Sequence, residues 1–212
     1  MKKTLLLISA ILIIGGCASM NQRGTPPRNA LALRPAIIPR SSWDEGLPSG
    51  VFRNHKPGRI VITDEGKIAL EITRPRKYLD YINKEGKKER KWDDIPYHFY
   101  VDRAGKIYQG RMPQLETEIF TLGQSLTGDL YISFLDDFDA REVTKQELES
   151  LVQLCAWLCA KFGIEPETGI TTDMRLIRSK RPGRSLRDII SQGYLTVEVR
   201  KLWPKAKPEP RF

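Results

Sequence analysis

Cysteine and histidine are scarce in this chain of 212 residues, which has three cysteines and two histidines. The cysteines are Cys17, Cys155 and Cys159, and none of them belongs to a Cys-x-x-Cys pair. The two histidines, His55 and His98, are far apart in the sequence. This pattern argues against a disulfide framework and against a metal site built on paired cysteines.

An excess of acidic residues is also lacking, because 35 Lys and Arg residues outnumber 26 Asp and Glu residues and give a formal charge of +9. Removal of a leader that contains Lys2 and Lys3 leaves 9 − 2 = +7. A basic surface favours polyanions such as nucleic acid, anionic lipid or the acidic glycan and peptide of a cell wall. Charge alone does not choose among these partners, and it does not exclude a solvated surface without a specific partner.

The chain lacks an apolar run of comfortable membrane-spanning length, but a shorter run lies at its start. Lys2 and Lys3 precede uncharged residues 4–14, and Gly15-Gly16-Cys17 follows at once. This order is typical of a secretory signal, and we predict a signal peptide over residues 1–16.

Small residues before Cys17 resemble the lipobox of bacterial lipoproteins, in which the cysteine is acylated and becomes the mature N-terminus. Several acyl chains on one residue hold a protein to a bilayer far better than one chain does. Ala18, rather than Asp, follows the cysteine, and by resemblance to lipoprotein sorting this favours the outer membrane, facing the periplasm. The alternative is an ordinary cleaved signal with a chance cysteine.

Two segments have too few apolar residues to build a core. Residues 17–36 are rich in polar residues and proline, and we predict a flexible tether. Residues 204–212 have a similar composition and predict a flexible tail. The folded domain is therefore expected over residues 37–203.

Within that domain, β-branched and aromatic runs predict strands at 60–62, 97–101, 106–109 and 130–135. Thr144 and Glu147 have the spacing of a capping box, and the helix they begin is closed by Gly163. Further helices are predicted at 74–83 and 184–192. Strands mixed with separate helices indicate an α/β or α+β layered fold.

Cys155 and Cys159 lie four residues apart on the apolar face of the main helix. We predict two reduced, buried core cysteines, because cysteine packs as a small hydrophobic residue. A redox or metal-binding pair is the alternative interpretation.

Five blocks of the sequence occur in the order and spacing of one family. They are Ile-Ile-Pro-Arg-Ser-Ser-Trp at 37–43, the strand at 59–62, the Trp-to-Arg block at 92–111, the helix and loop at 144–164, and Pro-Gly with a following Leu at 182–186. Together they resemble the zinc-dependent N-acetylmuramoyl-L-alanine amidases, which include a bacteriophage lysozyme and animal peptidoglycan recognition proteins. The resemblance implies an α/β fold with a central mixed β-sheet flanked by helices, and a cleft for the stem peptide and its muramic acid.

In the working enzymes of this family, two histidines and one cysteine hold a zinc ion that activates water and polarises the amide. The resemblance places Thr63, Asp173 and Arg181 at these three positions. A hydroxyl, one carboxylate and a cationic guanidinium do not replace that set, so we expect a degenerate metal site and no cofactor. Arg181 and Asp173 are expected to form an ion pair there or to point separately to solvent.

The same resemblance identifies the remaining candidate site residues. Tyr97 and Ser179 stand at positions that are catalytic in the enzymes, although no catalytic role is expected here. Tyr97, His98, Trp92 and Arg111 are the predicted substrate-binding residues, with Tyr97 offering stacking or a hydrogen bond. Alternation along the strand would instead bury one of Tyr97 and His98.

Three functions from different classes remain open. The first is a non-catalytic, outer-membrane-anchored protein that binds peptidoglycan or muropeptides, its basic surface suiting stem-peptide carboxylates. The second is an active N-acetylmuramoyl-L-alanine amidase with a harder metal bound through Asp64, Asp173 and Glu118. The third is an envelope scaffold or regulator that binds another protein. Nucleic acid is not an expected partner, because no such motif is present and the signal predicts export.

Overall fold

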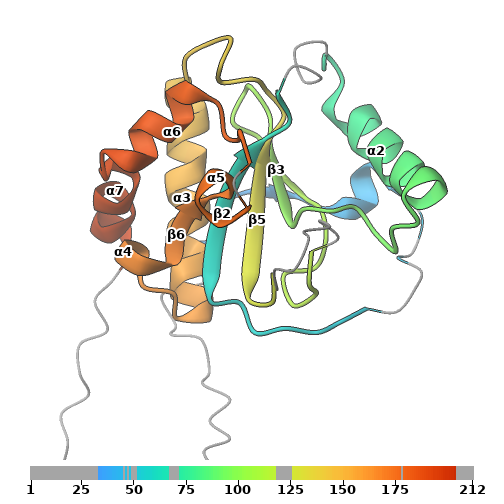
Figure 1. Cartoon of the computed structure of the whole chain (residues 1–212), viewed down its shortest axis with the longest axis horizontal. Helices are drawn as coiled ribbons and strands as arrows, with labels where there is room; N and C mark the ends of the chain where they lie inside the picture. Colours follow the sequence, from blue (N-terminus) through green and yellow to red (C-terminus); the bar gives the residue numbers. More distant parts are fainter. Residues whose placement is uncertain are drawn as a thin grey trace, which may run out of the picture.

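The computed structural model describes most of the predicted domain (Figure 1). The described residues are 33–44, 46, 48, 52–66, 72–117, 126–177 and 179–203. The predicted signal peptide, Cys17, most of the predicted tether, Glu118 and the predicted tail lie outside them. Within these ranges, no helix is both long enough and apolar enough to cross a bilayer.

The centre of the molecule is a six-stranded sheet in the order β1-β4-β3-β5-β2-β6. Its strands are β1 (Ile37–Ile38), β2 (Arg59–Asp64), β3 (Phe99–Val101), β4 (Ile107–Gln109), β5 (Asp129–Phe134) and β6 (Ile170–Thr172). β3 and β4 form an antiparallel hairpin, and all other neighbouring strands are parallel. The prediction of a central mixed sheet is therefore confirmed.

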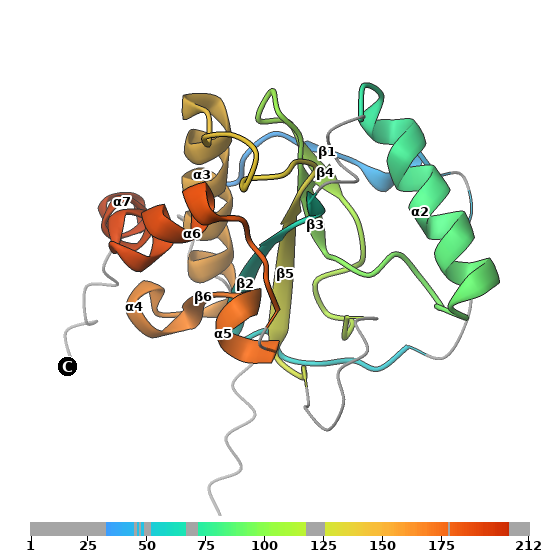
Figure 2. The same cartoon turned by 45° about the horizontal axis from the view of Figure 1, so that its top comes forward.

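Helices cover both faces of this sheet (Figures 1 and 2). α3, α6 and α7 lie on one face, and α2 lies on the other. The bounds are η1 (Arg40–Ser42), α2 (Pro75–Glu89), α3 (Lys145–Phe162), α4 (Pro166–Gly169), α5 (Asp173–Ile177), α6 (Arg184–Ser191) and α7 (Tyr194–Leu202). The helix predicted at 74–83 is thus longer than expected, and α4, α5 and α7 were not predicted.

The two central strands have apolar residues on both faces because helices cover both. Ile60, Ile62 and Leu130 pack in the core between the sheet and α3. Cys155 and Cys159 are fully buried in the same core with free thiols, which confirms the prediction of reduced core cysteines. Burial raises the pKa of the Cys155 thiol well above its ordinary value, so this sulfur is an apolar packing group.

The last residues of the predicted tether lie against the domain. Leu33 packs on the core beneath α3. The Arg34 guanidinium lies 5.7 Å from the centre of the Trp157 ring on the same helix. The packed part of the chain therefore begins before the predicted boundary at residue 37.

The capping box predicted for α3 is present. Thr144 Oγ1 accepts a hydrogen bond of 3.2 Å from the Glu147 amide, and Glu147 Oε2 accepts one of 2.9 Å from the Thr144 amide. Thr144→Ala is expected to lower the free energy of unfolding by about 1 kcal/mol, because it removes the cap of the central helix. Urea denaturation measures this loss. Thr144→Ser keeps the hydroxyl and should keep most of the stability, and equal stabilities of the alanine variant and the wild type would contradict the prediction.

Candidate functional site

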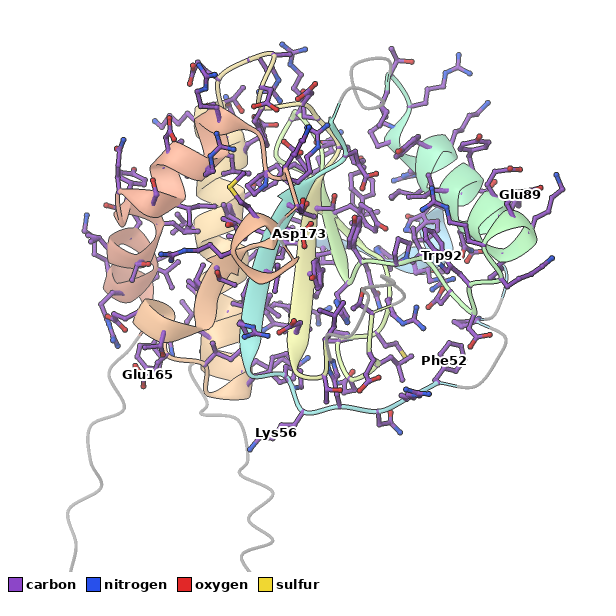
Figure 3. The ribbon with its side chains drawn as sticks, viewed as in Figure 1. Phe52, Lys56, Glu89, Trp92, Glu165 and Asp173 are labelled. Atoms are coloured by element: carbon purple, nitrogen blue, oxygen red, sulfur yellow. The ribbon has the colours of Figure 1, made fainter. Side chains whose placement is uncertain are left out.

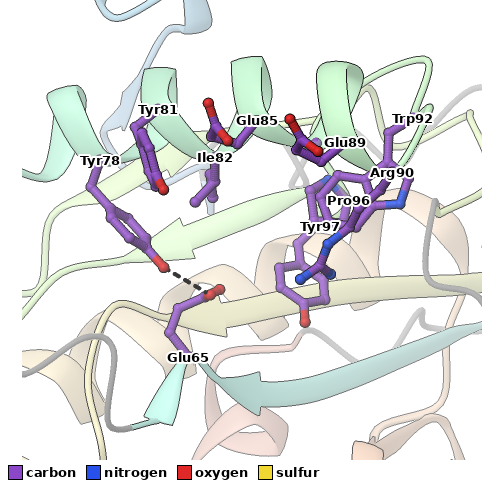
Figure 4. A pocket seen from close by; sticks show the side chains of 11 residues that line it. Glu65, Tyr78, Tyr81, Ile82, Glu85, Glu89, Arg90, Trp92, Pro96 and Tyr97 are labelled. Carbon is purple, nitrogen blue, oxygen red and sulfur yellow. Dashed lines mark hydrogen bonds between the residues drawn. The ribbon is translucent and has the colours of Figure 1, made fainter.

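A groove of about 380 Å³ lies between α2 and the sheet (Figure 4). One wall is the inward side of α2, and the opposite wall comes from the end of β2 and the segment that precedes β3. The lining residues are Glu65, Tyr78, Tyr81, Ile82, Glu85, Gly86, Glu89, Arg90, Trp92, Pro96 and Tyr97. The wall is therefore largely aromatic, with several charged groups among the rings.

Glu65 directly follows β2 and places a carboxylate in this groove. Its Oε1 accepts a hydrogen bond of 2.8 Å from Ser133 Oγ on β5, and its Oε2 accepts one of 3.2 Å from the Tyr78 hydroxyl on α2. Figure 4 shows the second of these bonds spanning the groove. Burial raises the pKa of Glu65, while the two hydrogen bonds oppose the shift by stabilising the charged form.

Trp92 and Tyr97, two of the predicted substrate-binding residues, both line the groove. The Trp92 ring packs directly on the helix at Gly86, where an added Cβ would lie 2.1 Å from the ring. Tyr97 is half-buried, and its ring centre is 5.7 Å from those of both Tyr100 and Tyr131. Burial raises the pKa of Tyr97 well above its ordinary value, so its hydroxyl is a neutral hydrogen-bonding group.

His98 and Arg111 are buried and do not line the groove, which argues against their predicted substrate-binding role. His98 has no exposed surface; its Nδ1 accepts a hydrogen bond of 2.9 Å from the Tyr131 amide, and Nε2 lies 2.8 Å from the Leu115 carbonyl. Burial lowers the pKa of His98 to about 3. Arg111 is 2% exposed and its guanidinium lies over the Phe52 ring. Both side chains hold the fold together.

Thr63, Asp173 and Arg181, the three residues that the family resemblance aligns with metal ligands, lie around the end of β2. Thr63 is buried at that end, and Asp173 follows Thr172 on the adjacent strand β6, where Thr172 pairs with Ile62. The Met174 amide donates a 2.8 Å hydrogen bond to the Arg181 carbonyl and brings the third position alongside. Figure 3 shows Asp173 in front of the sheet, with Trp92 on the side of α2.

Arg181 pairs with different carboxylates from the one predicted. Its Nη1 lies 3.2 Å from Oδ1 of Asp64 and 3.2 Å from Oδ1 of Asp137, and 3.9 Å from Oδ2 of Asp139. The guanidinium packs against Gly66, where an added Cβ would lie 1.7 Å from Nη2. Neither alternative expected from the sequence is observed: Arg181 does not pair with Asp173, and the two side chains do not point separately to solvent, because Asp173 is buried and Arg181 is paired elsewhere.

Asp173 has its own partners in the last loop. The Tyr131 hydroxyl donates a 3.3 Å hydrogen bond to it, and the Ser179 side chain is a second hydrogen-bonding partner. Ser179 Oγ also accepts a 2.8 Å hydrogen bond from the Arg181 amide. Burial raises the pKa of Asp173, and these two hydrogen bonds oppose the shift. Ser179 thus hydrogen-bonds to both the Asp173 side chain and the Arg181 backbone.

The structure gives little support to the alternative of a metal ion bound through Asp64, Asp173 and Glu118. Asp64 Oδ2 accepts hydrogen bonds from the Gly183 and Phe138 amides, at 2.9 Å and 3.2 Å, while Oδ1 faces Arg181. Glu118 lies outside the described residues. Among the residues that the structure describes, no three His, Cys, Asp or Glu side chains are grouped to hold a metal ion.

Several groove residues were missed from the sequence. Glu65 was not predicted because it lies two residues beyond Thr63, the position that the resemblance aligns with a metal ligand. Glu85 and Glu89 lie beyond residue 83, where the predicted helix ended. Their spacing of four residues is the signal that would have placed them on one side of a longer helix.

The family model for N-acetylmuramoyl-L-alanine amidases matches residues 69–185. Peptidoglycan-recognition protein SD of Drosophila melanogaster is 21% identical over 184 residues, which cover 85% of this chain and 93% of that protein.

Solved structures show the same likeness. N-acetylmuramoyl-L-alanine amidase LysC from Clostridium intestinale URNW superposes with a TM-score of 0.60 at 22% identity, covering 75% of this chain and 97% of the other. A complex of tracheal cytotoxin with the ectodomains of peptidoglycan recognition proteins LCa and LCx gives a TM-score of 0.63 at 21% identity, covering 74% and 95%. At these identities the structures establish a shared fold.

Proposed function

The chain belongs to the N-acetylmuramoyl-L-alanine amidase family, and on that premise we propose that it binds peptidoglycan fragments in the groove without a resident zinc ion. One observation supports the absence of a resident zinc ion. Arg181, which the family resemblance aligns with the cysteine ligand, pairs its guanidinium with Asp64 and Asp137. A permanent cation held at that point repels a divalent metal.

The donor set also does not fit zinc. Thr63 offers a neutral hydroxyl, and the Asp173 carboxylate is held by Tyr131 and Ser179. No imidazole is free to replace the missing ligands, because the sequence has two histidines and both are used elsewhere. His55 Nδ1 accepts a 2.8 Å hydrogen bond from the Gly128 amide, and His98 is buried as described above. These residues therefore do not support a zinc-dependent hydrolytic step, and a binding protein is the proposed function rather than an amidase.

The walls of the groove suit a glycopeptide. Trp92, Tyr78 and Tyr97 present aromatic rings on which sugar and peptide groups stack, and the tyrosine hydroxyls supply polar contacts. Ligand sites are commonly concave, largely apolar, and completed by a few placed polar groups. The tracheal cytotoxin complex of related recognition proteins is a parallel case on the same fold.

Purified peptidoglycan tests this function directly. The full chain, in detergent, should co-sediment with it and remain bound at about 0.5 M salt, where exposed ion contacts are screened. An unrelated protein with a similar isoelectric point, near 9.5, is the control for adsorption by charge. Absence of binding, together with capture of a single envelope protein, would favour the regulator alternative instead.

We further propose that the protein is anchored by acyl chains on Cys17 to the outer membrane and faces the periplasm. Cys17→Ser is expected to move the protein from the membrane fraction to the soluble periplasmic fraction, because the acylated sulfur is lost. Cell fractionation with immunoblotting measures the shift, and Cys155→Ser, in the folded core, is the matched control. A Cys17→Ser protein that stays with the membrane would contradict lipid anchoring.

A further inference from the structure

The groove has the opposite charge to the chain. The formal charge of the chain is +9, yet the charged residues that line the groove are Glu65, Glu85, Glu89 and one cation, Arg90. The expectation that a basic surface binds stem-peptide carboxylates therefore does not hold for this groove. Its lining carries three carboxylates against one guanidinium.

Helix α2 contributes two carboxylates and no lysine to the lining of the groove. Lys77, Lys84 and Lys88 are exposed and do not line the groove. Glu85 and Glu89, four residues apart, belong to the lining. Residues three or four apart share one side of a helix, which places Glu85 and Glu89 together at the groove, while Lys88 borders that side and pairs with Glu89.

Cations near the groove leave part of its negative charge uncompensated. Arg90 lies 4.9 Å from the centre of the Trp92 ring, and Arg181 pairs with Asp64 and Asp137. Glu89 pairs with Lys88 at 2.8 Å. Glu65 and Glu85 form no ion pair within the part of the chain that the structure describes, although the nearby Arg181 guanidinium acts to lower the pKa of Glu65 and Glu85 acts to raise the pKa of Lys88.

Glu65 is the carboxylate best placed to contact a ligand. Ser133 and Tyr78 hold its two oxygens, one bond to each, so the side chain is fixed in orientation. A carboxylate oxygen accepts more than one hydrogen bond, which leaves acceptor capacity on both oxygens. A charged group held in a partly buried groove is stabilised by an opposite charge beside it.

We infer that the groove selects peptides that carry a primary ammonium group, and that Glu65 is the residue that accepts it. An ammonium has three donors and no acceptor, which matches a carboxylate with spare lone pairs. The aromatic walls formed by Tyr78, Trp92 and Tyr97 add cation–π attraction. This inference rests on the proposed peptidoglycan-fragment function and specifies its ligand.

A stem peptide can carry a primary ammonium group in two places. One is the α-ammonium of its first residue, which is free only after the bond to muramic acid has been cut. The other is the side-chain ammonium of a diamino acid within the peptide. Acetylation of each amine separately distinguishes the two sources.

The test is calorimetric titration of the full chain with synthetic L-alanyl-γ-D-glutamyl-L-lysyl-D-alanine. Four forms are compared: the free peptide, the peptide acetylated at the α-amine, the peptide acetylated at the side chain, and the peptide acetylated at both. We expect the free peptide to bind about tenfold more tightly than the doubly acetylated one. The singly acetylated form that loses this gain identifies the amine that is recognised.

Two variants assign the effect to the groove. Glu65→Gln keeps the size and shape of the side chain and should reduce the preference for the free peptide to less than about twofold. Glu85→Gln, on the opposite wall, should reduce it by a smaller factor. Glu149→Gln is the control, because Glu149 is exposed on α3 and paired with Lys145 outside the groove. Thermal denaturation of each variant verifies that it is folded.

Each outcome decides between the claims. Equal affinity of the wild type for the free and doubly acetylated peptides overturns selection for an ammonium, and leaves fragment binding intact. A full preference in folded Glu65→Gln overturns the assignment to Glu65. If no peptide form binds, and a muropeptide with its sugar does not bind either, the proposed function itself fails.

Discussion

Asp64→Ala is expected to lower the free energy of unfolding by about 3 kcal/mol at pH 7. The Asp64 carboxylate is buried, accepts hydrogen bonds from the Gly183 and Phe138 amides, and lies 3.2 Å from Arg181. Removing one partner of a buried pair costs about 3–5 kcal/mol, because the remaining groups stay desolvated. The lower end applies, since Arg181 is partly exposed and retains Asp137.

Two further variants separate the sources of this loss. Asp64→Asn keeps an oxygen for the two amides and removes only the charge facing Arg181, so its loss should be smaller. Asp139→Asn alters an exposed carboxylate 3.9 Å from the same guanidinium and should change stability by less than about 0.5 kcal/mol. Urea denaturation gives all three values. An Asp64→Ala protein as stable as Asp139→Asn would show that the carboxylate is not a structural centre of this loop.

A fall in pH from 7 to 5 is expected to remove about 2 kcal/mol of unfolding free energy through His98. Burial lowers the pKa of His98 to about 3, whereas an imidazole in the unfolded chain titrates near 6.5. The unfolded state therefore binds more protons between these values. The contribution is fully present above about pH 6.5 and is lost as pH falls toward 3, at about 1.4 kcal/mol per pH unit.

His98→Gln isolates this contribution, because glutamine retains hydrogen-bonding capacity and does not titrate. The variant should be less stable at pH 7, yet its stability should fall less than that of the wild type between pH 7 and 5. Carboxylates elsewhere affect both proteins alike, so the difference of the two slopes measures His98. Parallel pH profiles for the wild type and the variant would contradict a buried, neutral His98.

Local sequence patterns were sufficient for the central strands and for α3. The strand over 130–135 and the capping box at Thr144 depend on neighbouring residues, and both are present in the structure. The end of α2 was missed because the polar stretch 84–89 contains Gly86, and an interior glycine weakens a helix. Gly86 is accommodated there because the Trp92 ring occupies the space that a side chain would need.

The candidate site was predictable only in part. The family resemblance placed Trp92 and Tyr97, and both line the groove. It failed for His98 and Arg111, because the burial of these side chains depends on loops from distant parts of the chain. The pairing of Arg181 with Asp64 and Asp137 was also not predicted, because these carboxylates come from distant parts of the chain.

The groove and the Arg181 ion-pair cluster are neighbouring but separate parts of the structure. The Arg181 side chain with its carboxylates occupies one end of β2, and Glu65 with its hydroxyl partners faces the groove just beyond. The groove lining thus does not include Thr63, Asp173 or Arg181, the residues that the family resemblance aligns with metal ligands. We therefore expect ligand affinity that is independent of metal.

The central claim is that the protein binds muropeptides without zinc and does not cleave them. It is tested most directly by calorimetric titration of a monomeric muropeptide into the full chain, once with zinc and once with a chelator. Each mixture is then assayed for free stem peptide. We predict the same affinity under both conditions and no released peptide. Release of stem peptide in zinc that stops with the chelator would contradict the account.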